Sequence, residues 1–358
     1  MHLPTTMRAA ILHGPRMVSI KCVPVPLLES DEVLVAVDAV GLCGSDIHCY
    51  TGERSIEYPM VLGHEITGRI VATGTNVQAQ RLGERVVVEP NIPCGRCTLC
   101  TRGLGRICVH KQSIGLTRWG GLADYVAVPN RFAWSIPETL TLSDAATIEP
   151  TTVAVHALSH AQVEPGATIA IVGCGGVGLL LATVAIAQGY LVVAIEPNET
   201  RRSAVLAAGA SCAFAALDAQ DAHTIFEQAG VVAIFECAGL SITTQLCLDA
   251  APQGSCIVLV GLGTEDVALN PLRFVRNELE IRGALIYEHP KDFARTIHLI
   301  ASGKLTPGNT AGPPQPLENL PTLLEAMAAG KLDAKPLIAV RPAQKGIQKG
   351  ISNGMEDG

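Results

Sequence analysis

The sequence is short of charge and of aromatic side chains. Only 16% of its 358 residues are charged and 4% are aromatic, whereas 48% are hydrophobic. The net charge is -7 and no run of Lys and Arg stands out, so the sequence offers neither nucleic acid nor an anionic membrane surface a basic patch to bind. Few aromatics also argue against a large aromatic cage for a hydrophobic substrate.

A long uninterrupted apolar run is missing as well. The most apolar stretch, residues 167–195, contains five glycines and predicts strand, turn, helix and strand rather than a membrane span. Residues 1–14 lack a basic start followed by an apolar run, so we expect no signal peptide and a cytoplasmic location. Residues 344–358 are polar and rich in Gly, and we expect them to form a flexible tail.

Cysteine, by contrast, is abundant. The chain has twelve, and without an export signal they indicate a reducing compartment, where clustered cysteines bind metal or catalyse more often than they form disulfides. One segment, residues 90–110, holds four of them with the spacing C-x2-C-x2-C-x7-C: Cys94, Cys97, Cys100 and Cys108.

Two metal sites compete for this four-cysteine segment. Four thiolates suit a tetrahedral zinc, and such a site has no open coordination position, so its zinc would be structural. An iron–sulfur cluster also takes four thiolates, but the bacterial ferredoxin run continues C-x3-C-P. Here seven residues lie between Cys100 and Cys108, and Val109 rather than Pro follows Cys108. The spacing therefore favours structural zinc, and the chemistry is expected elsewhere.

A second set of metal-binding residue types lies earlier in the chain. Cys43, His64 and Glu65 offer one thiolate, one imidazole and one carboxylate. Three protein ligands and a water form the pattern of a catalytic zinc. Asp46 could hold the second nitrogen of His64, as metal-bound imidazoles usually require. We therefore expect an open zinc site here.

A further carboxylate, Glu149, stands in a stretch that is otherwise almost uncharged. A buried carboxylate is costly unless it is paired or bound to metal, which makes Glu149 a candidate for the same site. The alternative is a carboxylate at the start of a helix, just before Pro150.

A glycine-rich turn follows the buried strand expected at 168–172. The turn has the spacing G-x-G-x-x-G and is followed by a helix that ends at Gly189. Its glycines let the backbone approach a pyrophosphate at the helix N-terminus, where N–H groups favour an anion. The residues expected to bind the dinucleotide there are Gly173, Gly175, Gly176, Val177 and Gly178.

The residue that ends the next expected strand bears on which dinucleotide binds. Glu196 can accept hydrogen bonds from both hydroxyls of the adenine ribose and would repel a 2′-phosphate, which favours NAD over NADP. Arg201 and Arg202 follow closely and could accommodate that phosphate, so NADP stays an alternative.

The strand and helix pattern repeats after residue 230. Segments 231–239 and 254–263 are expected to be buried strands, and one more strand and a helix from 290 to 302 follow. This alternation indicates a parallel, doubly wound α/β sheet. Ligands bind at the C-terminal ends of such strands, so Gly239, Leu262 and Ile286 are expected to line the nicotinamide side. Residues 254–272 could supply an edge strand for pairing across a two-fold axis.

With these residues in view, the chain resembles the zinc-containing medium-chain dehydrogenases/reductases over residues 7–341. The stretch GHEITGRIVATGTNV (63–77) is similar to that family's zinc signature, and the four-cysteine segment and the glycine-rich turn follow in the family's order. The IEP at 148–150 is similar to the polyol branch, which contains sorbitol, xylitol, butanediol and threonine dehydrogenases.

The resemblance implies metal-binding roles. Cys43 and His64 look like ligands of a catalytic zinc, and Glu65 looks like the third ligand. Glu149 looks like a fourth group, which binds the metal directly or holds its water and the substrate. The sequence alone leaves open which of the two glutamates is the third ligand.

Other roles concern the residues just after Cys43. Ser45 and His48 resemble a proton relay from the substrate hydroxyl to solvent. The polyol enzymes often carry an aromatic where this sequence has Cys49, with Tyr50 one place on. This departure leaves the substrate contact at that position undecided, although we expect Tyr50 to lie near the metal.

The resemblance also implies a domain organisation. We expect a β-rich catalytic domain like the chaperonin GroES in residues 1–150 and 288–343, with the structural zinc lobe at 90–110. Residues 151–287 would form a Rossmann domain that binds NAD. The family further implies a homodimer or homotetramer.

The expected function is oxidation of a secondary alcohol of a small polyol, sugar or cyclitol, with two zinc ions per chain and hydride transfer to NAD. A physiological carbonyl reductase would use the same site in reverse. An amino-alcohol dehydrogenase of the threonine type is another candidate, although no Arg that could bind a carboxylate is evident near the substrate motifs. The alternative that is not an enzyme is a non-catalytic NAD-binding sensor.

Overall fold

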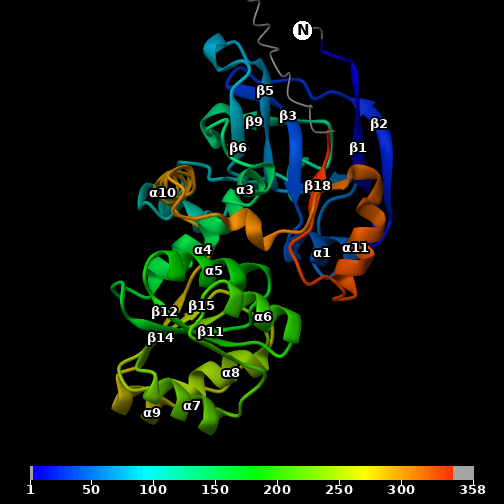
Figure 1. Ribbon diagram of the computed structural model, residues 1–358. Helices are drawn as coiled ribbons and strands as arrows, with labels where there is room; N and C mark the ends of the chain where they lie inside the picture. Colours follow the sequence, from blue (N-terminus) through cyan, green and yellow to red (C-terminus); the bar gives the residue numbers. More distant parts are fainter. Residues whose placement is uncertain (1–2, 342–358) are drawn as a thin grey trace, which may run out of the picture.

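The computed structural model describes residues 3–341, so the tail expected at 344–358 lies outside the described part (Figure 1). Figure 1 shows a β-rich part, in blue and cyan, joined by the orange and red C-terminal segment, and below it a green and yellow part in which helices surround a sheet. In residues 3–341 no helix is both long and apolar enough to cross a membrane.

The β-rich part contains two sheets. A three-stranded sheet has the order β2-β1-β4, and a seven-stranded sheet has the order β10-β6-β5-β3-β18-β17, with β9 also paired to β3. The strands are β1 (Thr6–Leu12), β2 (Val18–Pro24), β3 (Glu32–Gly41), β4 (Met60–Val61), β5 (Glu65–Thr73), β6 (Arg85–Val88), β9 (Tyr125–Pro129), β10 (Ala133–Ser135), β17 (Gln315–Pro316) and β18 (Leu337–Ala339).

The C-terminal segment completes this larger sheet. β18 pairs antiparallel with β3, with Ile338 opposite Val40. Side chains of β3, β5, β9 and α11 (Leu320–Ala328) share one hydrophobic core, to which Val35, Ile66 and Leu324 belong. Apolar burial is the main stabilising contribution to such a core. The last described residues therefore pack against some of the first.

The second part is an all-parallel sheet of six strands in the order β13-β12-β11-β14-β15-β16. The strands are β11 (Thr168–Val172), β12 (Leu191–Ile195), β13 (Cys212–Phe214), β14 (Val231–Glu236), β15 (Cys256–Leu259) and β16 (Glu280–Gly283). The helices are α4 (Ile148–His160), α5 (Gly176–Ala187), α6 (Glu199–Ala207), α7 (Ala219–Gln228), α8 (Ser241–Ala250), α9 (Pro271–Asn277) and α10 (Lys291–Ala301).

Alternate residues of β11 point to opposite faces of this sheet, and each face has its own core. Ile169 and Ile171 belong to a core with side chains of α4, α5 and α10. Ala170 and Val172 belong to a second core, with side chains of α7 and α8. Helices therefore cover both faces, which confirms the doubly wound α/β fold predicted from the sequence.

The strand order determines where a ligand can bind. Chain connections run outward from β11 to β12 on one side and to β14 on the other, so β11 and β14 flank the switch point of the sheet. The edge strands are β13 and β16. The expectation that residues 254–272 supply an edge strand is wrong, because β15 lies between β14 and β16.

Short elements connect these parts. They are η1 (Ala79–Arg81), α1 (Gly44–Thr51), β7 (Asn91–Ile92), α2 (Thr98–Thr101), η2 (Gly105–Ile107), β8 (Gln112–Ser113), η3 (Asn130–Phe132), α3 (Leu142–Ala146), η4 (Pro307–Thr310) and η5 (Leu317–Asn319). α10 packs with α4 on the parallel sheet. The domain boundaries near residues 150 and 287 stay predictions.

Candidate active site and metal centres

The sheet register brings Cys43, His64 and Glu65 together. β3 and β5 run antiparallel, and Gly41 at the end of β3 lies opposite Glu65 at the start of β5. Cys43 follows β3 directly and caps the N-terminus of α1. One ligand atom from each of the three side chains lies within 4.8 Å of the others, and two of the three residues are buried. The set is thus built by strand pairing rather than by closeness in sequence.

Asp46 connects the segment that carries Cys43 with the segment that carries His64 and Glu65 through hydrogen bonds. Its Oδ2 accepts the backbone N–H of Cys43 at 2.9 Å, and its Oδ1 accepts that of Gly63 at 3.1 Å. The same Oδ1 lies 3.4 Å from Nδ1 of His64, which is long for a hydrogen bond. Burial alone would raise the pKa of Asp46, but His64 and these hydrogen bonds lower it. Asp46 thus stays ionised and fixes the backbone on both sides of the site.

Lys335, from the segment just before β18, is a partner that the sequence did not suggest. Its Nζ donates to Glu65 Oε1 at 2.6 Å and to the carbonyl of Leu42 at 3.3 Å. Burial would lower the pKa of Lys335, but Glu65 and Cys43 raise it, so the ammonium form is kept. This contact joins residues 270 positions apart, which explains why no local pattern could predict it.

The donor set fits zinc. Glu65 Oε2 is buried and, within residues 3–341, has no hydrogen-bond partner, while Oε1 is occupied by Lys335. A buried carboxylate oxygen without a donor is costly, and a cation held by Oε2, the Cys43 thiolate and the His64 imidazole would relieve that cost. Thiolate, imidazole and carboxylate are zinc ligands in proteins.

Glu149 lies in the first turn of α4 and is buried. It does not belong to the group whose ligand atoms lie within 4.8 Å of one another. Burial raises the pKa of Glu149 to about 7; Glu65 adds to this effect and His64 opposes it. Glu149 is thus a helix-start carboxylate that also lies near the metal-binding group, and its role at the metal stays a prediction.

Two hydrogen bonds connect Ser113, Asn91 and Tyr287, and Tyr287 lies near Glu149. The hydroxyl of Ser113 donates to Asn91 Oδ1 at 3.0 Å, and Asn91 Nδ2 donates to the hydroxyl of Tyr287 at 2.8 Å. Tyr287 in turn interacts electrostatically with the Glu149 carboxylate. Because the amide N–H of Asn91 can only donate, the proton of the Tyr287 hydroxyl is not taken up by Asn91. Sequence reasoning missed both Tyr287 and Asn91.

The expected relay residues lie on α1. Ser45 Oγ is 3.5 Å from Nε2 of His64. The side chain of His48 is largely exposed, and its Nδ1 lies 2.5 Å from Oε2 of Glu53. This hydrogen bond lowers the pKa of Glu53. The structure thus places a hydroxyl beside the metal-binding group and an imidazole nearer to solvent.

The expectation for Tyr50 is wrong. Its hydroxyl donates to Glu325 on α11 at 2.5 Å, and the guanidinium of Arg16 lies over its ring. Cys49 is fully buried in the core of the β-rich part. Both side chains therefore stabilise the packing of α1 and do not join the metal-binding group.

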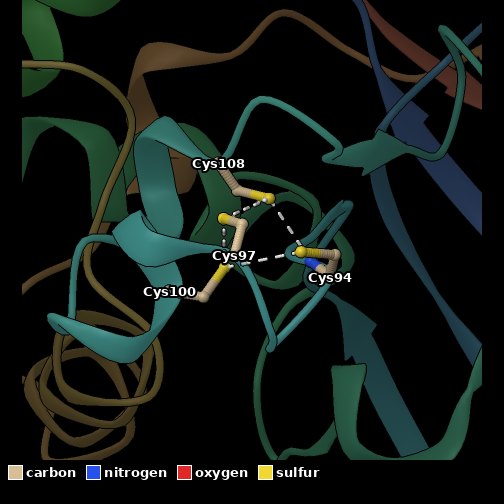
Figure 2. Close-up of side chains that lie close together, drawn as sticks. All are labelled: Cys94, Cys97, Cys100 and Cys108. Carbon is tan, nitrogen blue, oxygen red and sulfur yellow. Dashed lines mark hydrogen bonds between the residues drawn. The ribbon is translucent and has the colours of Figure 1, made fainter.

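The four-cysteine segment forms a separate lobe (residues 90–110), in which the sulfurs converge (Figure 2). The sulfur of Cys97 lies 3.5 Å from that of Cys100 and 3.8 Å from that of Cys108, and Cys94 and Cys100 are 4.0 Å apart. Four thiolates around one zinc would have sulfurs about 3.8 Å apart, from a Zn–S bond of about 2.3 Å. Backbone N–H groups, first that of Arg96, lower the pKa of Cys94 to about 6. The lobe fits a structural zinc.

The glycine-rich turn has the shape that a dinucleotide requires. A Cβ on Gly178 would lie 1.9 Å from the carbonyl oxygen of Gly173, so only glycine allows α5 to approach β11 this closely. Around Gly175 and Gly176 a Cβ would meet nothing within 4 Å. This leaves open space at the N-terminus of α5, where the N–H groups of the first turn, including that of Val177, have no partner within the helix.

Glu196 stands at the end of β12, as predicted, but it is buried. Its Oε2 accepts the N–H of Cys174 at 2.8 Å and its Oε1 that of Asn198 at 2.9 Å. Arg202 donates to the carbonyls of residues 196 and 197, and Arg201 reaches the carbonyl of Leu332 at 3.4 Å. Glu196 therefore holds the glycine-rich turn, and each of its oxygens keeps acceptor capacity.

The other expected cofactor residues also lie beyond the C-terminal ends of the strands. Gly239 follows β14 with a φ of 70°, and a Cβ there would meet the backbone of Leu262 at 3.0 Å. The side chain of Leu262 is exposed. Ile286 precedes Tyr287 and has a φ of 47°, a strained conformation for a β-branched residue.

Comparisons with known proteins agree with this geometry. Residues 29–138 match the alcohol dehydrogenase GroES-like domain, and residues 176–302 match the zinc-binding dehydrogenase family. The chain is 35% identical to the sorbitol dehydrogenase of Bacillus subtilis over 311 residues, which are 84% of this chain and 88% of that protein.

Solved structures are similar as well. Galactitol-1-phosphate dehydrogenase from Escherichia coli superposes with a TM-score of 0.87 and 27% identity, over 93% of this chain and 100% of the other. A zinc-binding dehydrogenase from Sinorhizobium meliloti, solved with NADP bound, superposes with a TM-score of 0.85 and 29% identity, over 94% and 100%. The chain therefore belongs to the zinc-containing medium-chain dehydrogenases/reductases, in their polyol dehydrogenase branch.

Proposed function

We propose that this enzyme oxidises a secondary alcohol of a small polyol, sugar or cyclitol and passes the hydride to NAD. The observation that carries the proposal is the group of Cys43, His64 and Glu65, in which a buried carboxylate oxygen has no hydrogen-bond partner among the described residues. Relatives named for sorbitol and for galactitol 1-phosphate support a polyhydroxylated substrate.

Cys43, His64 and Glu65 would hold the catalytic zinc, which supplies Lewis-acid stabilisation of an alkoxide when it is bound. Lys335 holds Glu65 in place and balances its charge. Glu149, with its pKa near 7, orients the substrate hydroxyl rather than serving as a permanent ligand. Its absence from the group of close ligand atoms supports this assignment.

The hydroxyl proton would leave through Ser45 and His48. Ser45 lies beside His64, and His48 reaches solvent, where Glu53 can accept from its Nδ1. A bound NAD would supply the acceptor for the hydride, and that acceptor chemistry belongs to the cofactor. Gly239, Leu262 and Ile286 would surround the nicotinamide ring, and the residues of the glycine-rich turn would bind the pyrophosphate.

NAD is proposed over NADP because Glu196 would lie against a 2′-phosphate. The Arg202 guanidinium already donates to two backbone carbonyls, so it has few hydrogen bonds left for that phosphate. The Arg201 guanidinium donates one long hydrogen bond, to the carbonyl of Leu332, and is therefore the freer of the two. The four-cysteine lobe would hold a second, structural zinc.

The domain organisation, location and assembly are proposed along with the function. Residues 1–150 and 288–343 would form the catalytic domain and residues 151–287 the NAD-binding domain. All twelve cysteines are free, which supports a reducing, cytoplasmic location. The edge strand β16, with its half-exposed Ile281, supports pairing of two copies into a homodimer or a homotetramer.

The test follows NADH absorbance with NAD or NADP and a panel of polyols, cyclitols, secondary alcohols and amino alcohols. Turnover of a polyol with NAD supports the proposal. Turnover of amino alcohols alone would replace it with the threonine-type activity, and reduction of ketones alone would point to a reductase. No turnover in either direction by protein carrying only one zinc ion would favour a non-catalytic NAD sensor, because the open site would then be empty.

A further inference from the structure

A cavity of about 220 Å³ lies between the four-cysteine lobe and the segment that carries Tyr287. Tyr287 lines this cavity and also interacts electrostatically with Glu149, so the cavity adjoins the proposed reaction centre. The strained residue Ile286 lines it as well. Backbone strain of this kind clusters at ligand sites, where the surrounding structure must hold it in place.

Glu89, in the wall of this cavity, is a fully buried carboxylate with an unfilled position. Its Oε2 accepts both Trp134 Nε1–H and a ring nitrogen of His289, each at 2.8 Å. Its Oε1 is buried and has no partner among residues 3–341. Leaving such a buried oxygen without a donor is energetically unfavourable. A hydroxyl donated by a bound ligand would supply the missing hydrogen bond.

Two arginines line the same cavity. Arg106 comes from the lobe, and Arg131 precedes the buried ring of Phe132, over which its guanidinium lies. In the described part of the chain neither guanidinium donates a hydrogen bond to another side chain or to a carbonyl. The wall also includes Glu288. The cavity therefore offers carboxylate acceptors together with two unpaired cationic donors.

The combination of a carboxylate acceptor and two arginines argues against a simple cation and against a purely apolar ligand. Two guanidinium groups would repel a cation, and an apolar ligand would leave Glu89 without a donor. A molecule that carries both hydroxyls and an acidic group could donate a hydrogen bond to the carboxylate of Glu89 and accept hydrogen bonds from the two guanidinium groups. Carboxylates and phosphates are the anions that Arg recognises best, because its planar fork can donate two parallel hydrogen bonds.

We propose that this cavity binds the substrate beyond its reacting carbon, and that the substrate is a polyhydroxy compound ending in a carboxylate or a phosphate. Glu89 accepts a hydrogen bond from a hydroxyl of the chain, and Arg106 and Arg131 bind the acidic end. This inference rests on the proposed dehydrogenase activity and narrows its substrate class. It assigns an acid-binding role to two arginines that lie outside the substrate motifs recognised in the sequence.

Binding can be measured without turnover through Trp134, whose indole donates to Glu89. The chain has two tryptophans, and a Trp119→Phe variant leaves Trp134 as the sole emitter. Sorbitol, gluconate and sorbitol 6-phosphate share one carbon chain and end in a hydroxyl, a carboxylate and a phosphate. We expect at least one of the two acids to change the Trp134 emission with a Kd about tenfold or more below that of sorbitol.

The variant Arg106→Ala/Arg131→Ala should remove this preference. We expect it to weaken binding of the acid about 10- to 100-fold, so that the Kd of the acid approaches that of sorbitol. Arg102→Ala is the matched control, since Arg102 is an exposed arginine of the same lobe and does not line the cavity. The thermal unfolding midpoint of each variant shows whether it is folded.

The outcomes separate this inference from the proposed function. Oxidation of sorbitol with equal affinity for all three ligands, unchanged in the double variant, would overturn the acidic end group and leave the dehydrogenase intact. A preference for gluconate over sorbitol 6-phosphate, or the reverse, names the acid. If no polyol is oxidised but an acid still binds at Trp134 and the double variant abolishes this, the proposed function fails and the cavity assignment stands.

Discussion

The four-cysteine lobe and the group of Cys43, His64 and Glu65 both gather metal-binding side chains, but they are built in opposite ways. The lobe takes its ligands from residues 94–108, and no residue between 93 and 110 belongs to a hydrophobic core cluster. The other group is assembled by the pairing of β3 with β5 and is flanked by the buried Leu42 and Ile66.

This difference predicts different roles for the metal ions at the two positions. Without zinc, little apolar burial would hold the lobe, so metal binding there contributes directly to folding. The Cys43 group keeps its shape through Asp46, Lys335 and the sheet, so its metal is free to serve chemistry. On the proposed assignment, zinc would be needed to fold the lobe, whereas the Cys43 group would keep its shape without metal.

Replacing Glu65 by Gln should give the largest effect. Because a neutral amide oxygen is a poor zinc ligand, we expect turnover to fall about 10³-fold or more and the bound zinc to fall to one per chain. Glu149→Gln is the matched variant. It should keep both zinc ions and lower turnover about 10- to 100-fold. The reverse pattern of zinc loss would make Glu149 the third ligand.

Lys335→Met should remove the cation that neutralises the Glu65 carboxylate. In the zinc-free protein it leaves the Glu65 carboxylate buried without its cation, and we expect the free energy of unfolding to fall by about 3 kcal/mol in urea titrations. Lys331→Met, at an exposed lysine of the preceding turn, should change it by less than about 0.5 kcal/mol. Equal stability of the two variants would show that Lys335 does not support the site.

Cys100→Ser should open the lobe and leave the rest folded. We expect trypsin to cut at the exposed Arg96 and Arg102 about 10²-fold faster, because local unfolding exposes the backbone there. Cys22→Ser, at an exposed cysteine on β2, should leave the rate unchanged. Global unfolding of the Cys100 variant under the same conditions would contradict the separation of lobe and core.

The smallest expected effect concerns His160, where α4 ends near Arg106 of the lobe. Burial, and then His156 and the nearby arginines, lower the pKa of His160 below 6.5. The unfolded state then binds more protons than the folded state as the pH falls through 6.5, so stability is present above that pH and declines below it. We expect His160→Gln to lessen the loss of thermal stability between about pH 7.5 and about pH 5.5 by a few degrees or less. An unchanged pH dependence would exclude His160 as a contributor.

The features that the sequence predicted correctly are those with a local pattern. The cysteine spacing, the glycine-rich turn with Glu196, and the alternation of strands and helices each depend on residues close in the chain. The motif around His64 and Glu65 is local too, and its pairing with Cys43 follows from one antiparallel contact.

The features that were missed depend on contacts between distant residues. Lys335 meets Glu65 only because β18 returns to β3, and Tyr287 meets Asn91 across 196 positions. Tyr50 was misplaced because its position next to the ligands in sequence does not say which side of α1 it occupies. Propensity and spacing carry no information on such contacts, which tertiary packing decides.

The most direct test of the two-site account is the zinc content of Cys43→Ala, measured beside its rate of polyol oxidation. The account predicts two zinc ions per chain in the wild type. In the variant it predicts one zinc, a lobe that still resists trypsin, and no turnover. A variant that keeps both zinc ions, or that still oxidises the substrate, would contradict the assignment of Cys43, His64 and Glu65 as the catalytic metal site.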